Sequence, residues 1–272
     1  MGPTTTGSWR GRHAVITGGS SGIGLALAHR LARRGAAVSL IARGEERLTA
    51  AAAALREHGA TIGTAAADVA DRQALVRALD DLQAKAGPCD ALVTCAGLAR
   101  PGHFLELDDE VFRTMMEVDY FGTLHAIRAV APAMVTRGSG SIVAVSSGAA
   151  LLGIFGYTAY APAKFAVRGL MEVLRDELGP HGVHVACVYP PDVDTPQLAD
   201  ENRFKPDETF AISGTVEPMS ADEVADAMLR GIDRRRFAIY PNAEMRLLAT
   251  LAPPLAPLVR RLVDRKVRGA RG

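Results

Sequence analysis

The sequence predicts an α/β protein with a doubly wound parallel sheet of about seven strands. Short apolar runs alternate with longer amphipathic segments along most of the chain, and repeated strand–helix units form parallel sheets with helices on both faces. With 272 residues, 48% of them hydrophobic and 22% charged, the chain also has the size and composition of one such domain. We therefore expect residues 1–272 to form a single domain.

The first strand–helix unit contains a glycine-rich loop. An apolar run at residues 13–17 is followed by Gly18, Gly22 and Gly24, and a helical segment continues over residues 25–34. In this order the loop brings backbone N–H groups and the positive end of a helix against a pyrophosphate, and glycine allows a close approach. The unit predicts a Rossmann-type dinucleotide loop, with a plain connecting loop as the alternative.

The second strand, expected at residues 37–42, ends beside Arg43. At this position a carboxylate suits the ribose 2′-hydroxyl of NAD, whereas a guanidinium suits a 2′-phosphate. Arg43 therefore predicts NADP as the cofactor. The alternative is a solvated arginine that opens the helix expected over residues 45–58.

The alternation continues along the chain. We expect strands at residues 61–67, 90–95, 141–146, 183–189 and 237–240, and helices at residues 71–86, 108–137, about 160–179 and 221–234. Asp68-Val69 and Cys95-Ala96-Gly97 follow strand ends, at the carboxyl edge where parallel sheets bind ligands. The small residues at 95–97 either let the chain pass close to a flat cofactor or form an ordinary turn.

Three residues predict proton-transfer chemistry. Ser147 follows the strand run at 141–146, and Tyr160 and Lys164 are four residues apart, which places them on one helix face. A neighbouring ammonium favours the phenolate and moves the pKa of a phenol toward neutrality. A serine hydroxyl can donate to a carbonyl oxygen as charge develops on it. The alternative is a surface pair with a snorkelling lysine.

Two segments outside this pattern are candidates for substrate binding. Residues 190–220 are rich in proline and polar residues, which predicts a mobile substrate loop. Residues 243–272 form a C-terminal extension whose apolar run is too interrupted by proline to span a bilayer. We expect this extension to act as a helical substrate lid, to form a subunit contact, or to lie at a membrane interface.

Together these motifs resemble the short-chain dehydrogenase/reductase family. The resemblance covers nearly the whole chain and rests on Thr17-Gly18-x-x-x-Gly22-Ile23-Gly24, Cys95-Ala96-Gly97, Ser147 and Tyr160-x-x-x-Lys164. It implies a Rossmann-type sheet of seven strands. It also implies hydride transfer between NAD(P)(H) and a carbonyl compound or alcohol.

The resemblance further implies a role for each matching residue. Tyr160 would protonate the carbonyl oxygen, Lys164 would lower the pKa of Tyr160 and hold the nicotinamide ribose, and Ser147 would orient the oxygen. The implied cofactor contacts are Gly18, Ser20, Ser21, Gly22, Ile23, Gly24, Arg43, Asp68, Val69, Cys95, Ala96, Gly97, Tyr160, Lys164, Pro190 and Thr195. Of these, Ser20 and Arg43 would meet the 2′-phosphate, Asp68 and Val69 the adenine, and Thr195 the carboxamide.

Asp119 departs from the family pattern, which has asparagine at this place on the long helix. We count Asp119 among the catalytic residues because that asparagine belongs to a relay of tyrosine, lysine and water. An aspartate keeps the acceptors but loses the donor, and its charge would stabilise the Lys164 ammonium and weaken the effect of Lys164 on Tyr160. The alternative is that only the backbone geometry at residue 119 matters.

A narrower resemblance concerns the substrate. Residues 155–160, 189–196 and 201–206 resemble the reductases of this family that act in sphingoid-base synthesis, which implies NADPH-dependent reduction of a long-chain 2-amino ketone. Residues 149–155 would offer an apolar wall, and Asp192 and Asp194 would face the substrate ammonium. Core packing and solvated loop acids are the alternatives. The rival functions are reduction of a steroid, polyketide or other bulky apolar carbonyl compound, and NADP(H) sensing without catalysis.

Composition narrows the possible partners and location. The formal net charge of +1 argues against general nucleic-acid binding. Cys89, Cys95 and Cys187 have no metal-ligand spacing, so we expect no metal site and a reducing cytosol. We therefore expect a cytoplasmic homo-oligomer that binds a hydrophobic small molecule, with peripheral membrane contact through the C-terminal segment as a further possibility.

Overall fold

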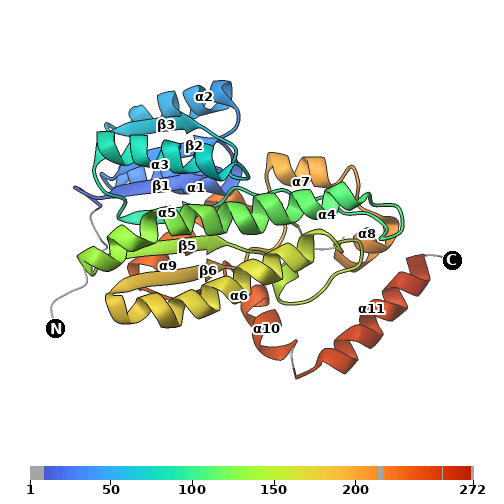
Figure 1. The fold of residues 1–272 in the computed structure, drawn as a ribbon. Coiled ribbons are helices and arrows are strands. Elements are labelled where there is room, and N and C mark those ends of the chain that lie inside the picture. Colours follow the sequence, from blue (N-terminus) through green and yellow to red (C-terminus); the bar gives the residue numbers. More distant parts are fainter. Residues whose placement is uncertain (1–8, 214–216, 253, 271–272) are drawn as a thin grey trace.

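A seven-stranded parallel sheet forms the centre of the computed structural model, which describes residues 9–213, 217–252 and 254–270. Every strand expected from the sequence is present. Across the sheet the order is β3 (Ile62–Ala66), β2 (Ala37–Ala42), β1 (His13–Thr17), β4 (Ala91–Thr94), β5 (Gly140–Val145), β6 (Val183–Val188) and β9 (Ala238–Ile239) (Figure 1). The order reverses between β1 and β4, which is where such sheets bind ligands beyond their carboxyl ends.

The central strands are apolar because both of their faces are covered. β1, β4 and β6 are buried along their whole length. Val15 pairs with Ser39 of β2 on one side and with Leu92 of β4 on the other, in the regular register of parallel strands. Such continuous runs of valine, isoleucine and leucine are typical of parallel sheets between two helix layers.

Two helix layers cover the sheet. One consists of α1 (Gly22–Arg33), α2 (Glu45–Arg56) and α9 (Ala221–Asp233), and the other of α3 (Arg72–Ala86), α5 (Gly122–Arg137) and α6 (Tyr160–Leu178). Leu27, Leu48 and Met228 belong to the apolar cluster on the first face. Leu75 and Met171 belong to the cluster on the second face. The amphipathic periodicity of each helix therefore decides which side of it meets the sheet.

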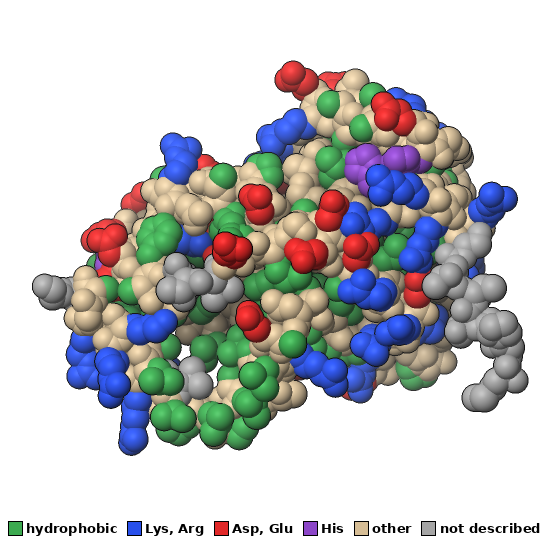
Figure 2. Space-filling view, turned by 180° about the vertical axis from the view of Figure 1, so that it is seen from behind, with side chains coloured by type: hydrophobic (Ala, Val, Ile, Leu, Met, Phe, Trp, Pro, Cys, Tyr) green, Lys and Arg blue, Asp and Glu red, His purple; other side chains and the backbone are tan. Residues whose placement is uncertain are grey.

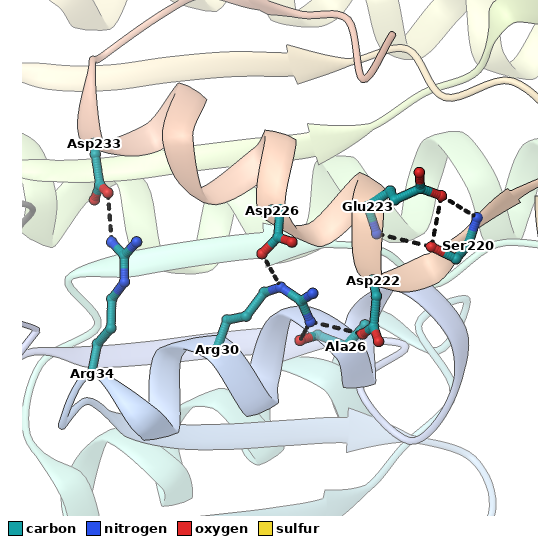
Figure 3. Close-up of polar contacts among 8 residues, drawn as sticks. All are labelled: Ala26, Arg30, Arg34, Ser220, Asp222, Glu223, Asp226 and Asp233. Carbon is teal, nitrogen blue, oxygen red and sulfur yellow. Dashed lines mark hydrogen bonds and ion pairs between the residues drawn. The ribbon is translucent and has the colours of Figure 1, made fainter.

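Ion pairs join α1 to α9, which comes almost 200 residues later in the chain (Figure 3). On α1, Arg30 bonds both to Asp226 and to Asp222 on α9, the latter at 2.8 Å. Arg34, just after α1, pairs with Asp233 at 2.6 Å. A capping box between Ser220 and Glu223 fixes the start of α9. These contacts hold α1 and α9 side by side in the first helix layer.

The long helix expected at residues 108–137 is not uniform. It consists of α4 (Asp109–Met115), a π-helical segment, η1 (Met116–Phe121), and α5. The wider turn shifts the direction of the side chains that follow, and it contains Asp119, which is buried. A π turn within an α-helix often marks a functional position. Periodicity alone had indicated a single α-helix.

Residues 190–220 are more regular than the polar sequence predicted. They contain a two-stranded sheet of β7 (Val193–Asp194) and β8 (Met219–Ser220), and the helices α7 (Pro196–Glu201) and α8 (Asp207–Ser213). The expectation of an irregular loop was therefore wrong for most of this segment, because proline at the start of α7 begins a helix rather than preventing one. Residues 214–216 of the expected loop lie outside the described residues.

The C-terminal extension is helical, as expected. It comprises α10 (Ala243–Leu251) and α11 (Ala256–Ala270), which lie beyond α6 and away from the two helix layers (Figure 1). α11 packs against α8, and the Lys266 ammonium donates to the carbonyl oxygen of Ile212 at 3.2 Å. Among the described residues, none of the helices combines the length and the apolarity needed to cross a bilayer.

Candidate active site

A cavity of about 630 Å³ opens at the carboxyl edge of the sheet. Its walls come from the residues that follow β1, β2, β4, β5 and β6, from the start of α6, from α7 and from α10. The chain therefore brings segments that are far apart in sequence into one depression at the point where the strand order reverses. Most of the predicted site residues line this cavity.

Ser147, Tyr160 and Lys164 meet at the centre of the cavity. Tyr160 begins α6, and Lys164 lies one helical turn further on, with its Nζ atom 5.5 Å from the centroid of the Tyr160 ring. The Ser147 hydroxyl forms a hydrogen bond with Tyr160 and accepts one from the N–H of Ala149 at 3.1 Å. A phenol, a hydroxyl and an ammonium thus share one small space, as a proton-transfer site requires.

The protonation of Tyr160 differs from the expectation. Burial raises the pKa of Tyr160 to about 12, and Lys164 and Ser147 oppose this rise without cancelling it. Lys164 lowers this pKa, as expected, but the effect does not bring it toward neutrality, because the hydroxyl is buried and because Asp119 also raises its pKa. At neutral pH the phenol is therefore protonated and ready to donate its proton.

Lys164 is held by the backbone and by Asp119. Its Nζ atom lies 3.3 Å from Oδ1 of Asp119 and donates to the carbonyl oxygen of Val145 at 3.3 Å. Burial lowers the pKa of Lys164, but Asp119 and Tyr160 raise it further, so the net direction is upward. The ammonium therefore stays charged beside Tyr160.

Asp119 does not line the cavity, although we had counted it as catalytic. Its Oδ1 atom accepts from the N–H of Leu98 at 3.0 Å, and its Oδ2 atom is buried without a hydrogen-bond partner among the described residues. Burial raises the pKa of Asp119, against the effect of Lys164. A Cβ atom at Gly97 would lie 2.7 Å from Oδ1, so glycine makes room for this pair. Asp119 is thus a positioning residue that acts through Lys164.

The glycine loop has the donors that a pyrophosphate needs. Gly18, Ser20, Ser21, Gly22 and Ile23 line the cavity, and α1 begins at Gly22. Within the described chain, the first turn of α1 contains no acidic residue and receives no cap from the Ser21 side chain. Its N–H groups therefore remain available to an anion at the positive end of the helix. The residues present fit a dinucleotide here.

Gly24 has a packing role in the glycine loop. It does not line the cavity, and a Cβ atom at this position would lie 2.4 Å from the carbonyl oxygen of Gly18. Glycine therefore allows α1 to pack closely behind the loop. Direct contact of Gly24 with the cofactor stays a prediction.

Arg43 stands at the far end of the cavity together with Arg47, which the sequence reading missed. Both arginines are exposed, and neither forms an ion pair within residues 9–213, 217–252 and 254–270. The four-residue spacing of Arg43 and Arg47 was the available signal. Asp68 and Val69 line the neighbouring wall, as do Cys95, Ala96, Gly97, Pro190 and Thr195 nearer the centre.

A buried polar cluster beside Tyr160 was also missed. Tyr157 donates a hydrogen bond to Glu201, and the Lys205 ammonium lies 3.2 Å from Glu201 and 3.0 Å from Asp192. Glu201 and Asp192 line the cavity, whereas Asp194 is exposed and does not. Of the two aspartates expected to face the substrate ammonium, only Asp192 is therefore placed in the cavity wall.

Another part of the cavity wall is apolar, although Glu217 and Glu244 also line the cavity. Ala149, Leu152 and Ile154 line it, so the wall expected at residues 149–155 is present in part. Met245 and Leu248 of α10 complete this wall. The C-terminal extension therefore contributes directly to the cavity wall.

The fold and the site define a nicotinamide-dependent oxidoreductase, and comparisons give its family. The model of the short chain dehydrogenases matches residues 12–206. The chain belongs to the short-chain dehydrogenase family. Among curated relatives, the 3-ketodihydrosphingosine reductase of Dictyostelium discoideum is 38% identical over 266 residues, which cover 91% of this chain and 80% of that protein.

Two further similarities agree with this assignment. The 3-ketodihydrosphingosine reductase of Mus musculus is 39% identical over 253 residues, which cover 91% of this chain and 76% of that protein. The solved structure of a short-chain dehydrogenase from Sphingobium yanoikuyae in complex with NADPH matches with a TM-score of 0.78 and 30% identity. The match covers 93% of this chain and 95% of that one.

Proposed function

We propose that this protein reduces 3-ketodihydrosphingosine to dihydrosphingosine with NADPH. The observation that carries the proposal is the position of Tyr160. Burial raises the pKa of its phenol to about 12, and the phenol lies beside Ser147 and Lys164 in a cavity that is also lined by two arginines without an ion pair among the described residues. The two curated relatives described above bear the name of this activity.

The geometry supports the direction of reduction. A bound nicotinamide supplies a hydride to the carbonyl carbon, and the oxygen must then receive a proton. Tyr160 holds that proton at neutral pH, since its pKa is about 12, and an alkoxide is basic enough to take it. Ser147 can donate to the same oxygen as its charge grows. Lys164, which stays charged, stabilises the phenolate that remains.

The preference for NADPH rests on the arginine pair. Arg43 and Arg47 line the end of the cavity beyond the glycine loop. Two guanidinium groups suit a 2′-phosphate, whereas a ribose 2′-hydroxyl favours a carboxylate. The solved relative from Sphingobium yanoikuyae binds NADPH, which supports the same choice.

The cavity also suits a long aliphatic substrate. Leu152, Ile154, Met245 and Leu248 form one wall beside the reacting centre. Leu152 and Ile154 follow β5, whereas Met245 and Leu248 belong to α10 of the C-terminal extension. An alkyl chain that starts at Tyr160 can pack against these side chains. Burial of each CH₂ group would stabilise binding by about 0.8 kcal/mol.

The proposal is tested with purified protein, NADPH and a panel of ketones. The panel contains 3-ketodihydrosphingosine, a steroid ketone, a polyketide-type ketone and a short ketone, and products are identified by mass spectrometry. We expect the highest kcat/KM for 3-ketodihydrosphingosine. Absence of its turnover, with turnover of another member of the panel, would replace the proposed substrate by that compound.

We also propose peripheral membrane contact through α10 and α11. Five leucines on these helices and on the turn between them are at least 43% exposed, namely Leu247, Leu251, Leu255, Leu258 and Leu262. Arg260, Arg261, Arg265 and Lys266 lie among them on α11. Figure 2 shows hydrophobic side chains gathered at the lower edge of the molecule next to Lys and Arg side chains. Such a surface suits an anionic bilayer.

Three expectations about organisation stay predictions. They are that residues 1–272 form a single domain, that the protein is cytoplasmic, and that it forms a homo-oligomer. Size-exclusion chromatography with light scattering would decide the last of these.

A further inference from the structure

The polar cluster beside Tyr160 carries excess negative charge. Glu201 and Lys205 are buried, and Lys205 makes ion pairs with both Glu201 and Asp192. Two carboxylates therefore share one ammonium, which leaves one negative charge when both are ionised. Burial raises the pKa of Glu201, and the contacts with Tyr157 and Lys205 oppose this rise. Both carboxylates line the cavity, whereas Lys205 does not. A wall of this kind attracts a cation and repels an anion.

One oxygen of Glu201 remains available to a ligand. The contacts with Tyr157 and Lys205 both use Oε1. Oε2 has no hydrogen bond to any residue in the part of the chain that the structure describes, and it is not among the side-chain atoms that are fully buried without a partner. A carboxylate held at one oxygen can present the other to a donor in the cavity.

The cluster is also close to the reacting centre. The rings of Tyr157 and Tyr160 are 5.7 Å apart between centroids, and the charge of Glu201 raises the pKa of Tyr160. In a 2-amino ketone the nitrogen is on the carbon next to the carbonyl carbon. Its partner in the protein must therefore lie beside the residue that meets the carbonyl oxygen, as Glu201 does.

The charges that line the cavity are complementary to the charges of the proposed ligands, namely the anionic 2′-phosphate and the cationic ammonium. Arg43 and Arg47 stand at the end that we assign to the 2′-phosphate. Asp192, Asp200 and Glu201 also line the cavity, and they come from the segment between β6 and the end of α7 rather than from the β2–α2 segment that holds the arginines. A cation and an anion are thus attracted to different segments of one cavity.

We infer that Glu201 is a specificity-determining residue that binds the protonated 2-amino group of the substrate, held in place by Tyr157 and Lys205. The inference rests on the proposed function, because it assigns a part of that substrate to a particular side chain. It also differs from the sequence-based choice of Asp192 and Asp194. Asp194 lies outside the cavity wall, and Asp192 lines it but pairs with Lys205.

The test compares two substrates in the variant Glu201→Gln. One substrate is the long-chain 2-amino ketone, and the other is the ketone of the same chain length without the amino group. We expect KM for the amino ketone to rise about tenfold or more, since a charge-assisted hydrogen bond becomes a neutral one. KM for the ketone without the amine should change less than about twofold. Equal changes for both substrates, or no change, would overturn the inference.

Asp194→Asn is the matched control, because it removes a nearby carboxylate that does not line the cavity. It should leave both KM values as they are. Tyr157→Phe is a second variant, which removes the donor to Glu201 but keeps its charge. We expect it to raise KM selectively for the amino ketone, by a smaller factor than Glu201→Gln. A selective effect of Asp194→Asn would contradict the assignment to Glu201.

Folding of each variant is checked by its affinity for NADPH. If Glu201→Gln does not fold, the wild-type protein decides the question, because it should bind the amino ketone at least about tenfold more tightly than the ketone without the amine. Equal affinities would overturn the inference.

If the wild-type protein reduces other ketones but not the amino ketone, the proposed function fails and the inference fails with it. If it reduces the amino ketone without a selective effect of Glu201→Gln, only the inference fails.

Discussion

The Nζ atom of Lys164 lies 3.3 Å from Oδ1 of Asp119, and both side chains are buried. The pair joins the start of α6 to the π-helical segment η1 behind the cavity. A buried carboxylate beside the ammonium keeps Lys164 charged, but it also raises the pKa of Tyr160. The charge of Asp119 therefore weakens the effect of Lys164 on the phenol.

Asp119→Asn should shift the pH dependence of reduction. Reduction needs a protonated Tyr160, so activity is present below the pKa of this phenol and is lost as pH rises through it. Because Asp119 raises that pKa, its neutral replacement should move the alkaline loss of kcat to lower pH. The fold should persist, since asparagine can still accept from Leu98. The measurement is kcat across pH for both proteins.

Asp80→Asn is the control for this experiment, because Asp80 is exposed on α3, far from Lys164 in the sequence. It should not change the profile. Identical pH profiles for the wild type and Asp119→Asn would show that only the backbone at residue 119 matters.

Tyr160→Phe separates an enzyme from a cofactor sensor. Loss of the hydroxyl removes the proton donor, so kcat should fall by about 10²–10⁴-fold. NADPH affinity, measured by fluorescence titration, should stay within about threefold, since the ring still fills the same space. Retained turnover would mean that another group supplies the proton.

Arg43→Ala and Arg47→Ala should each weaken NADPH binding and leave NADH binding nearly unchanged. Loss of one charge-assisted contact costs about 1.5–3 kcal/mol, which corresponds to an increase in KM of about tenfold or more. Steady-state kinetics with both cofactors give the comparison. Arg56→Ala, at the other end of α2, is the control. Equal losses with NADH and NADPH would place the arginines outside the 2′-phosphate site.

Leu258→Glu should weaken binding to vesicles that contain anionic lipid. Leu258 is 53% exposed and lies two residues before Arg260, so a carboxylate there removes apolar contact and adds repulsion. We expect about tenfold less protein to sediment with vesicles of phosphatidylcholine and phosphatidylglycerol. Val173→Glu is the control, because Val173 is 56% exposed on α6. If wild-type protein does not bind these vesicles, the membrane contact is refuted.

The local pattern of apolar and polar residues was sufficient to predict the strands of the main sheet. Each strand of the main sheet was predicted, because strands covered on both faces are continuous apolar runs. The glycine loop and the Tyr160–Lys164 spacing were also visible, since each depends on neighbouring residues. The helical character of residues 196–213 was missed, because short polar helices have little periodicity to detect.

The sequence by itself determined the doubly wound sheet, the glycine loop and the pairing of Tyr160 with Lys164, because these depend on periodicity and on short spacings. Only the tertiary structure decided that Asp119 reaches Lys164 through a π turn, and that Gly24 packs behind the loop. It also decided that Glu201 meets Tyr157, which lies 44 residues earlier in the chain. Contacts of this kind, and the pKa of a buried phenol, depend on the packing of distant segments and on the exclusion of water, neither of which a local pattern contains.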